Sequence, residues 1–128
     1  MYVRFVVDEI DENSGVELGI FQAVYRLADA GQLHHCEAVW WEDLRWWFNR
    51  KLDKPDRFAR SRRAGANPCA ISWFKASARG HIARAHEMAA LLAEHYIPSR
   101  MVRAKRPGYV VYEDAFQVAA EPFRPELR

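Results

Sequence analysis

A cluster of arginines and lysines is the part of this sequence best suited to chemistry. It lies between positions 50 and 63 and contains only two aspartates. Guanidinium groups match phosphate oxygens in both charge and hydrogen-bond geometry. The cluster therefore predicts that the protein binds an anionic partner, either nucleic acid or a nucleotide.

Further basic residues and nearby aromatic residues extend this prediction. Arg103 and Lys105 would share one face of an extended strand, and aromatic rings beside basic residues can stack on bases. The candidate stacking or interface residues are Trp46, Trp73 and Tyr109. The candidate anion-binding residues are Arg57, Arg60, Arg62, Arg63, Lys75, Arg103 and Lys105. The alternative is a solvated loop together with a charged strand edge that prevents edge-to-edge pairing.

The tryptophans are concentrated in one segment. Four of the five lie between positions 40 and 47, within a predicted helix. One helix face cannot bury all four against a single core, so some must meet the basic loop, a ligand or a second subunit. Tryptophan is common at binding hot spots, and a homodimerising protein–protein interaction module is therefore an alternative function.

Acid–base catalysis has two weaker candidates, His81 and Glu113. His81 lies near Lys75 and Arg79 in sequence, and Glu113 lies at a predicted hairpin. Beside a basic strand, these groups would suit a nucleotide- or phosphoester-directed enzyme. The alternative is a helix histidine and a solvent-exposed turn. The His34-His35-Cys36 trio lacks the paired spacing of a zinc site, so we expect no metal and no cofactor.

Hydrophobic periodicity predicts the elements that position these residues. The segment Ser14 to Glu17 matches a capping box, which places a helix start at Ser14. Gly31 is a typical residue to follow the end of that helix. A long basic loop spans 53–67, and the sequence leaves open whether it is ordered. Strands are predicted at 2–7, 69–74, 101–104, 109–112 and 116–120, and helices at 15–30, 35–52 and 77–96.

This order, β-α-α-β-α-β-β-β, predicts a single α+β domain over residues 1–121, followed by a polar tail at 122–128. The last three strands are close in sequence, which favours a mostly antiparallel sheet with helices packed on one face. The strands at 69–74 and 101–104, joined by a helix, are the one segment that could form a parallel crossover unit. The uncovered sheet face would then be available to a ligand or a second subunit.

Length, charge and cysteine content bound the class of protein. The chain has 128 residues, and its net charge of +2 divides into −6 over residues 1–49, +10 over 50–106 and −2 over 107–128. No segment reads as a signal peptide or a membrane span. Two cysteines make no disulfide framework. We therefore expect a cytoplasmic protein with no membrane partner.

Two segments carry a resemblance to known sequences. The residues from Ile71 to Lys75, followed by a histidine-containing helix and then the residues from Pro107 to Asp114, resemble small uncharacterised bacterial proteins of similar length. The resemblance spans most of the chain. It implies a stand-alone bacterial domain and transfers no activity, cofactor or site residue.

Overall fold

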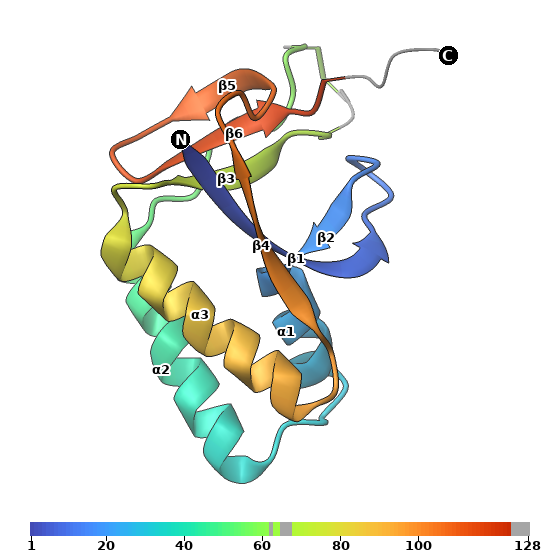
Figure 1. Cartoon of the computed structure of the whole chain (residues 1–128), viewed down its shortest axis with the longest axis vertical. Helices are drawn as coiled ribbons and strands as arrows, with labels where there is room; N and C mark the ends of the chain where they lie inside the picture. The colour runs from blue at the N-terminus through green and yellow to red at the C-terminus, as the bar shows by residue number, and fades with distance from the viewer. Residues whose placement is uncertain (62, 65–67, 124–128) are drawn as a thin grey trace.

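The computed structural model describes residues 1–61, 63–64 and 68–123, and it confirms the predicted α+β class (Figure 1). None of the helices in this described part combines the length and apolar character needed to cross a bilayer. A three-residue strand, β2, adds to the predicted order. The elements are β1 (Tyr2–Ile10), β2 (Glu17–Gly19), α1 (Ile20–Asp29), α2 (His35–Lys51), β3 (Ile71–Lys75), α3 (Arg79–Glu94), β4 (Ser99–Ala104), β5 (Tyr109–Glu113) and β6 (Gln117–Glu121).

Strand β1 organises the sheet, whose order is β2-β1-β3-β6-β5, with β4 also paired to β1. Every pairing is antiparallel. Because β3 and β4 both run antiparallel to β1, they are parallel to each other, and α3 connects them. The predicted crossover unit is therefore confirmed, with β1 lying between its two strands. The predicted hairpin at the end of the domain is β5 and β6.

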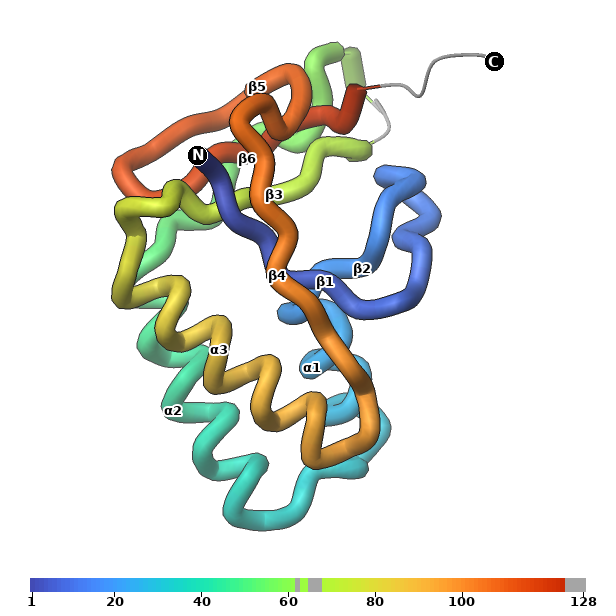
Figure 2. Tube along the Cα trace, in the orientation of Figure 1, coloured from blue at the N-terminus to red at the C-terminus, as the bar shows by residue number. Residues whose placement is uncertain are grey.

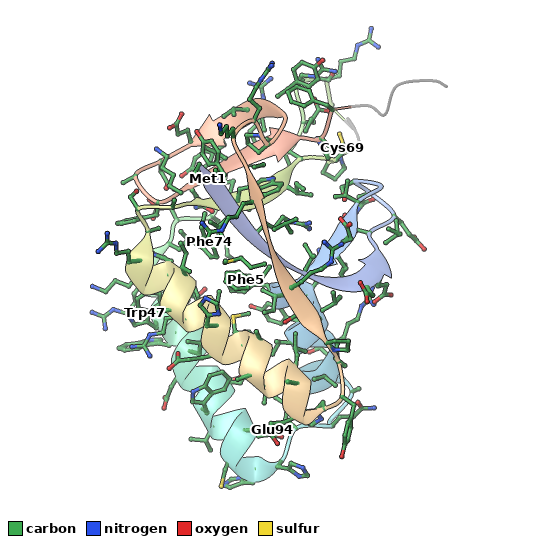
Figure 3. All side chains as sticks on the ribbon, in the orientation of Figure 1. Met1, Phe5, Trp47, Cys69, Phe74 and Glu94 are labelled. Atoms are coloured by element: carbon green, nitrogen blue, oxygen red, sulfur yellow. The ribbon has the colours of Figure 1, made fainter. Side chains whose placement is uncertain are left out.

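Alternate residues of β1 face the helices. Val3, Phe5 and Val7 are each at most 4% exposed and belong to one core cluster with residues of all three helices. The helices gather at one end of the molecule, and β3, β5 and β6 lie at the other (Figure 2). Phe5 and Phe74 lie between these two parts (Figure 3). Because side chains alternate between the two faces of a strand, these three residues form one apolar face of β1, and the helices pack on it.

The predicted helix start at Ser14 is wrong. Ser14 Oγ donates a hydrogen bond to the Asp11 carboxylate at 2.8 Å, and the Ser14 amide contacts the same oxygen. Glu17 lies in β2, opposite Ile10 of β1, and α1 begins at Ile20. Asp11 thus engages the side chain that would have capped a helix, and strand pairing to β1 takes the following residues. At the other end of α1 the prediction is confirmed, because Gly31 has a φ of 67°.

Candidate ligand-binding cavity

A cavity of about 550 Å³ opens where β1 changes its pairing partner. On one edge of β1, Val3 pairs with Phe74 of β3, whereas Val6 pairs with Gly19 of β2. Strands β2 and β3 diverge from this point (Figure 1), and Arg4 lies between the two pairing stretches. The volume falls within the roughly 300–1,000 Å³ that is common for small-molecule sites.

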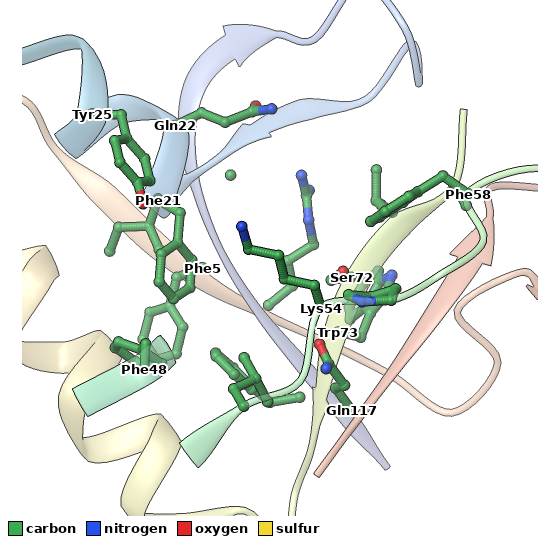
Figure 4. Close-up of a pocket in the computed structure, with 18 of the residues that line it drawn as sticks. Phe5, Phe21, Gln22, Tyr25, Phe48, Lys54, Phe58, Ser72, Trp73 and Gln117 are labelled. Carbon is green, nitrogen blue, oxygen red and sulfur yellow. The ribbon is translucent and has the colours of Figure 1, made fainter. Parts of the chain in front are cut away.

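The walls of the cavity are rich in aromatic side chains from several elements. Phe21 and Phe48 meet edge to face at 4.8 Å, and so do Tyr25 and Trp41 at 5.3 Å. In the close-up, Phe21 and Tyr25 lie on one side and Phe58 lies on the other (Figure 4). The aromatic lining residues are Phe5, Phe21, Tyr25, Trp41, Phe48, Phe58, Trp73 and Phe74. Such walls suit a flat apolar molecule.

Arg4 is the buried cation of the cavity. It is 8% exposed, and its Nη2 donates a hydrogen bond to the main-chain carbonyl of Glu17 at 2.7 Å. Burial lowers the pKa of Arg4, while the charges of Glu17 and Asp11 act in the opposite direction. A guanidinium carries five N–H donors, so Arg4 retains donors for a further partner.

Three further N–H groups of residues that line the cavity are buried without a hydrogen-bond acceptor among the described residues. The buried atoms Trp41 Nε1, Arg45 Nε and Trp73 Nε1 have no hydrogen-bond partner in the part of the chain that the structure describes. All three residues line the cavity. A buried donor without an acceptor costs about 1–3 kcal/mol. These atoms are themselves fully buried, so the unmet donors lie within the cavity walls and do not reach its surface.

The first part of the basic loop covers the cavity. Asp53, Lys54, Pro55 and Phe58 line it, and Lys54 extends between its two sides (Figure 4). The Asp53 carbonyl accepts a hydrogen bond from Gln117 Nε2 at 2.5 Å, and the Phe58 carbonyl accepts one from the Ala70 amide at 2.8 Å. The loop is therefore tied to β6 and to the segment that precedes β3.

The arginines predicted from this loop mostly contact the protein itself. Arg57 donates to the carbonyls of Ala59 and Arg60. Arg60 Nε lies 2.5 Å from the Glu121 carboxylate, and its guanidinium lies over the Tyr109 ring at 4.1 Å. Arg62 lies outside the described residues.

The other predicted anion-binding residues are spread over the molecule. Arg63 is exposed in the loop, and Lys75 Nζ pairs with Glu113 at 2.6 Å. Arg103 and Lys105 are exposed at and just beyond β4, an edge strand. None of these residues lines the cavity, so the structure does not bring the predicted set together.

The three predicted stacking residues also lie in different places. Trp46 is 63% exposed on α2 beneath the Arg50 guanidinium, which lies 4.4 Å from its ring. Tyr109 lies beneath Arg60 on β5. Trp73 is the one that lines the cavity. The tryptophans of α2 also differ in position: Trp46 is exposed, whereas Trp41 is 2% exposed and lines the cavity.

The two catalytic candidates lie apart from the cavity. His81 is 6% exposed, and its Nε2 lies 2.7 Å from the Lys51 carbonyl, so that nitrogen carries a proton and donates. Its ring packs on Phe116 at 4.5 Å. Glu113 is exposed and paired with Lys75. Among the described residues, no group of three or more His, Cys, Asp or Glu side chains is placed to hold a metal ion.

A second, smaller cavity of about 350 Å³ lies between the basic loop and β6. Cys69 and Glu121 line it, and the Cys69 thiol donates a hydrogen bond to Glu121 Oε1 at 2.7 Å. Burial raises the pKa of Cys69, and the Glu121 carboxylate raises it further. The thiol is therefore held in its protonated form, which is the weaker nucleophile.

Sequence reasoning missed Arg4, Trp41 and Lys54 as site residues. Arg4 had a readable signal, because it is a charged residue inside an otherwise apolar strand. The long-range pairing that places it beside β2 and β3 has no such local signal. Comparison of the chain with known protein families, curated proteins and solved structures finds no match to any of them.

Proposed function

We propose that this protein binds a small organic anion in the cavity between β1, β3, α1, α2 and the basic loop. The observation that supports this proposal is the lining itself, in which a buried arginine borders one aromatic-walled space. A buried cation is costly unless a counter-charge accompanies it. Glu17 and Asp11 offset part of the Arg4 charge, and a bound anion would add to that effect and accept hydrogen bonds from the remaining N–H groups of the guanidinium.

A small ligand fits these observations better than a polynucleotide. Arg60 and Lys75 are each paired with a carboxylate, and Arg57 folds back onto loop carbonyls. A nucleic-acid surface needs free cations that follow a phosphate backbone. The enzyme alternative needs one cavity that gathers His81 and Glu113, and neither residue is in the lining.

Thermal unfolding in the presence of candidate ligands tests this function. The panel comprises AMP, 2-naphthoate and single-stranded DNA, and the unfolding midpoint is followed by circular dichroism. A saturating small anion should raise the midpoint by about 5 °C or more. The paired variants are Arg4→Met inside the cavity and an Arg103→Ala, Lys105→Ala double variant at the edge of the sheet.

We expect the small-anion response to persist in the double variant and to disappear in Arg4→Met. Arg4→Met leaves the Glu17 carbonyl without its donor and should lower stability by about 1–3 kcal/mol, so its ligand response is measured against its own midpoint without ligand. The opposite result would overturn the proposal: a response to DNA alone that is lost in the double variant and kept in Arg4→Met.

A further inference from the structure

The charges around the cavity limit the charge of the ligand. Three cationic and two anionic side chains line it, namely Arg4, Arg45, Lys54, Asp11 and Asp53. The lining therefore carries one net positive charge. Two carboxylates outside the lining reduce the positive field further: Glu42 pairs with Arg45 at 2.9 Å, and the charge of Glu17 acts on Arg4. This balance favours a ligand with a single negative charge over a phosphate dianion or a nucleoside polyphosphate, which would meet the two aspartates as well.

The N-terminus of α1 opens into the cavity beside Arg4. Gly19 is the N-cap residue and provides no side-chain hydrogen bond to the first turn. A Cβ atom at Gly19 would lie 3.6 Å from Arg4 Nη2, so the guanidinium and the start of the helix are close neighbours. Gly19, Ile20, Phe21 and Gln22 all line the cavity. The first amides of a helix lack intrahelical partners and attract negative charge.

These two features define one place for an anionic head group. The guanidinium of Arg4 has a planar fork that matches the two oxygens of a carboxylate. The first residues of α1 line the cavity next to that guanidinium. Beyond it, the cavity offers aromatic surface that includes Trp41 and Trp73.

We infer that the ligand is a monocarboxylate attached to a flat apolar body, with its carboxylate held between Arg4 and the N-terminus of α1. The body packs among the aromatic residues of α1, α2 and the basic loop. Lys54, which extends between the two sides of the cavity (Figure 4), adds a second, weaker attraction. This inference rests on the proposed small-anion function and specifies its ligand class.

A matched set of three naphthalene compounds tests the ligand class by isothermal titration calorimetry at pH 8. The probes are 2-naphthoate, 2-naphthamide and 2-naphthyl phosphate, which share one flat body. They carry one negative charge, no charge and, since the second phosphate pKa is about 6, close to two negative charges. We expect 2-naphthoate to bind about tenfold more tightly than either of the other two.

Two variants assign that preference to residues. In Arg4→Met the affinity for 2-naphthamide should be kept, and the preference for 2-naphthoate over the amide should fall to about one. Lys54→Met changes an exposed loop side chain, so it should leave the fold intact and reduce the preference by only about two- to threefold. The Lys54 variant keeps the inference testable if Arg4→Met fails to fold.

The outcomes separate the ligand class from the proposed function. Tighter binding of 2-naphthyl phosphate or of the amide would overturn the monocarboxylate and leave a small-ligand cavity in place. A carboxylate preference that is unchanged in Arg4→Met would overturn the position assigned to the carboxylate. If none of the three probes binds, while single-stranded DNA binds, both the ligand class and the proposed function are wrong.

Discussion

The buried side chain of Gln117 donates a hydrogen bond to the main-chain carbonyl of Asp53 at 2.5 Å, and it donates another to the Asp114 carboxylate at 3.0 Å. Strand β6 is thereby joined to the first residue of the loop that covers the cavity. Gln117 is 2% exposed, so water does not compete for these bonds.

Replacing Gln117 with leucine should release the loop. The change keeps the volume of the side chain but leaves the Asp53 carbonyl without its donor, which should cost about 1–3 kcal/mol of unfolding free energy. Urea denaturation measures that loss, and limited trypsin digestion should cut after Arg57 and Arg60 sooner than in the original chain. Gln32→Leu, at an exposed position, is the matched control and should change neither result.

Asp114 should make stability depend on acid pH. Burial raises its pKa, but hydrogen bonds from the Phe116 amide, the Gln117 side chain and the Tyr112 hydroxyl outweigh that effect and hold the pKa below its ordinary value. Because the folded pKa is depressed, this contribution is present above about pH 3.9, the ordinary value. It is lost as the pH falls through the folded pKa.

Urea midpoints measured from pH 7 down to pH 2 check this dependence. Asp114→Asn should be less stable at pH 7 and should lose less stability than the original chain below about pH 3.9. Parallel profiles for the two proteins across that window would contradict the assignment.

Gly108 should not tolerate a side chain. Its φ is 143°, and a Cβ atom there would lie 2.0 Å from the Glu121 carbonyl oxygen, at the end of the β5–β6 pairing. Gly108→Ala should therefore destabilise the fold by about 3 kcal/mol or more. Gly31 has a φ of 67°, but a Cβ atom built there would meet no atom within 4 Å among the described residues. Gly31→Ala should therefore lower the free energy of unfolding by only about 1 kcal/mol. Equal losses in the two variants would argue against the close approach to Glu121.

His81 should contribute to the stability of the fold and not to ligand binding. His81→Leu removes the hydrogen bond to the Lys51 carbonyl, near the end of α2, and should cost about 1–3 kcal/mol in urea denaturation. The affinity of the cavity for 2-naphthoate should stay within about twofold of the original, since His81 does not line it. Lost binding with unchanged stability would instead support a direct role in ligand chemistry.

Two arginines of the basic loop should differ in their effect on stability. Arg60→Ala removes the ion pair with Glu121, whose side chain is 15% exposed, and the contact with Tyr109. Because Arg60 is itself 55% exposed, we expect a loss of only about 1 kcal/mol. Arg63→Ala, at an exposed position, should change stability by less than about 0.5 kcal/mol. Equal, large losses of DNA affinity in both variants would favour the basic surface over the cavity.

Local sequence patterns were sufficient for most of the elements. The apolar stripe that predicted α3 consists of Ile82, Ala85, Ala89, Leu92 and Tyr96. Ala85 and Leu92 are buried and Ile82 and Ala89 are partly buried, whereas Tyr96 lies beyond the end of α3 and is 94% exposed. The Glu113-Asp114 turn between the last two predicted strands predicted their hairpin, and β5 pairs with β6. Strand β2 was missed because the segment from Ser14 to Glu17 fits a capping box, and only the pairing of Glu17 with Ile10 of β1 decides against it.

The site was harder to predict because its parts come from distant segments. The walls join residues as far apart as Arg4 and Gln117. The basic cluster drew attention to the correct loop, but its arginines are mostly bound to carbonyls and carboxylates that only the fold brings near. Net charge along the chain does not show which cations are already neutralised, and Lys75 with Glu113 is such a pair.

The central position of β1 has a consequence for the order of folding. Its hairpin with β2 is local, whereas its partners β3 and β4 come from residues 71–75 and 99–104. During synthesis, the chain must therefore be complete to residue 104 before the first half of β1 can pair with β3 on one edge and β4 on the other. Such high contact order slows folding. The apolar face of Val3, Phe5 and Val7 packs on the helices, and α1 and α2 both precede β3 in the chain, so they can cover this face first.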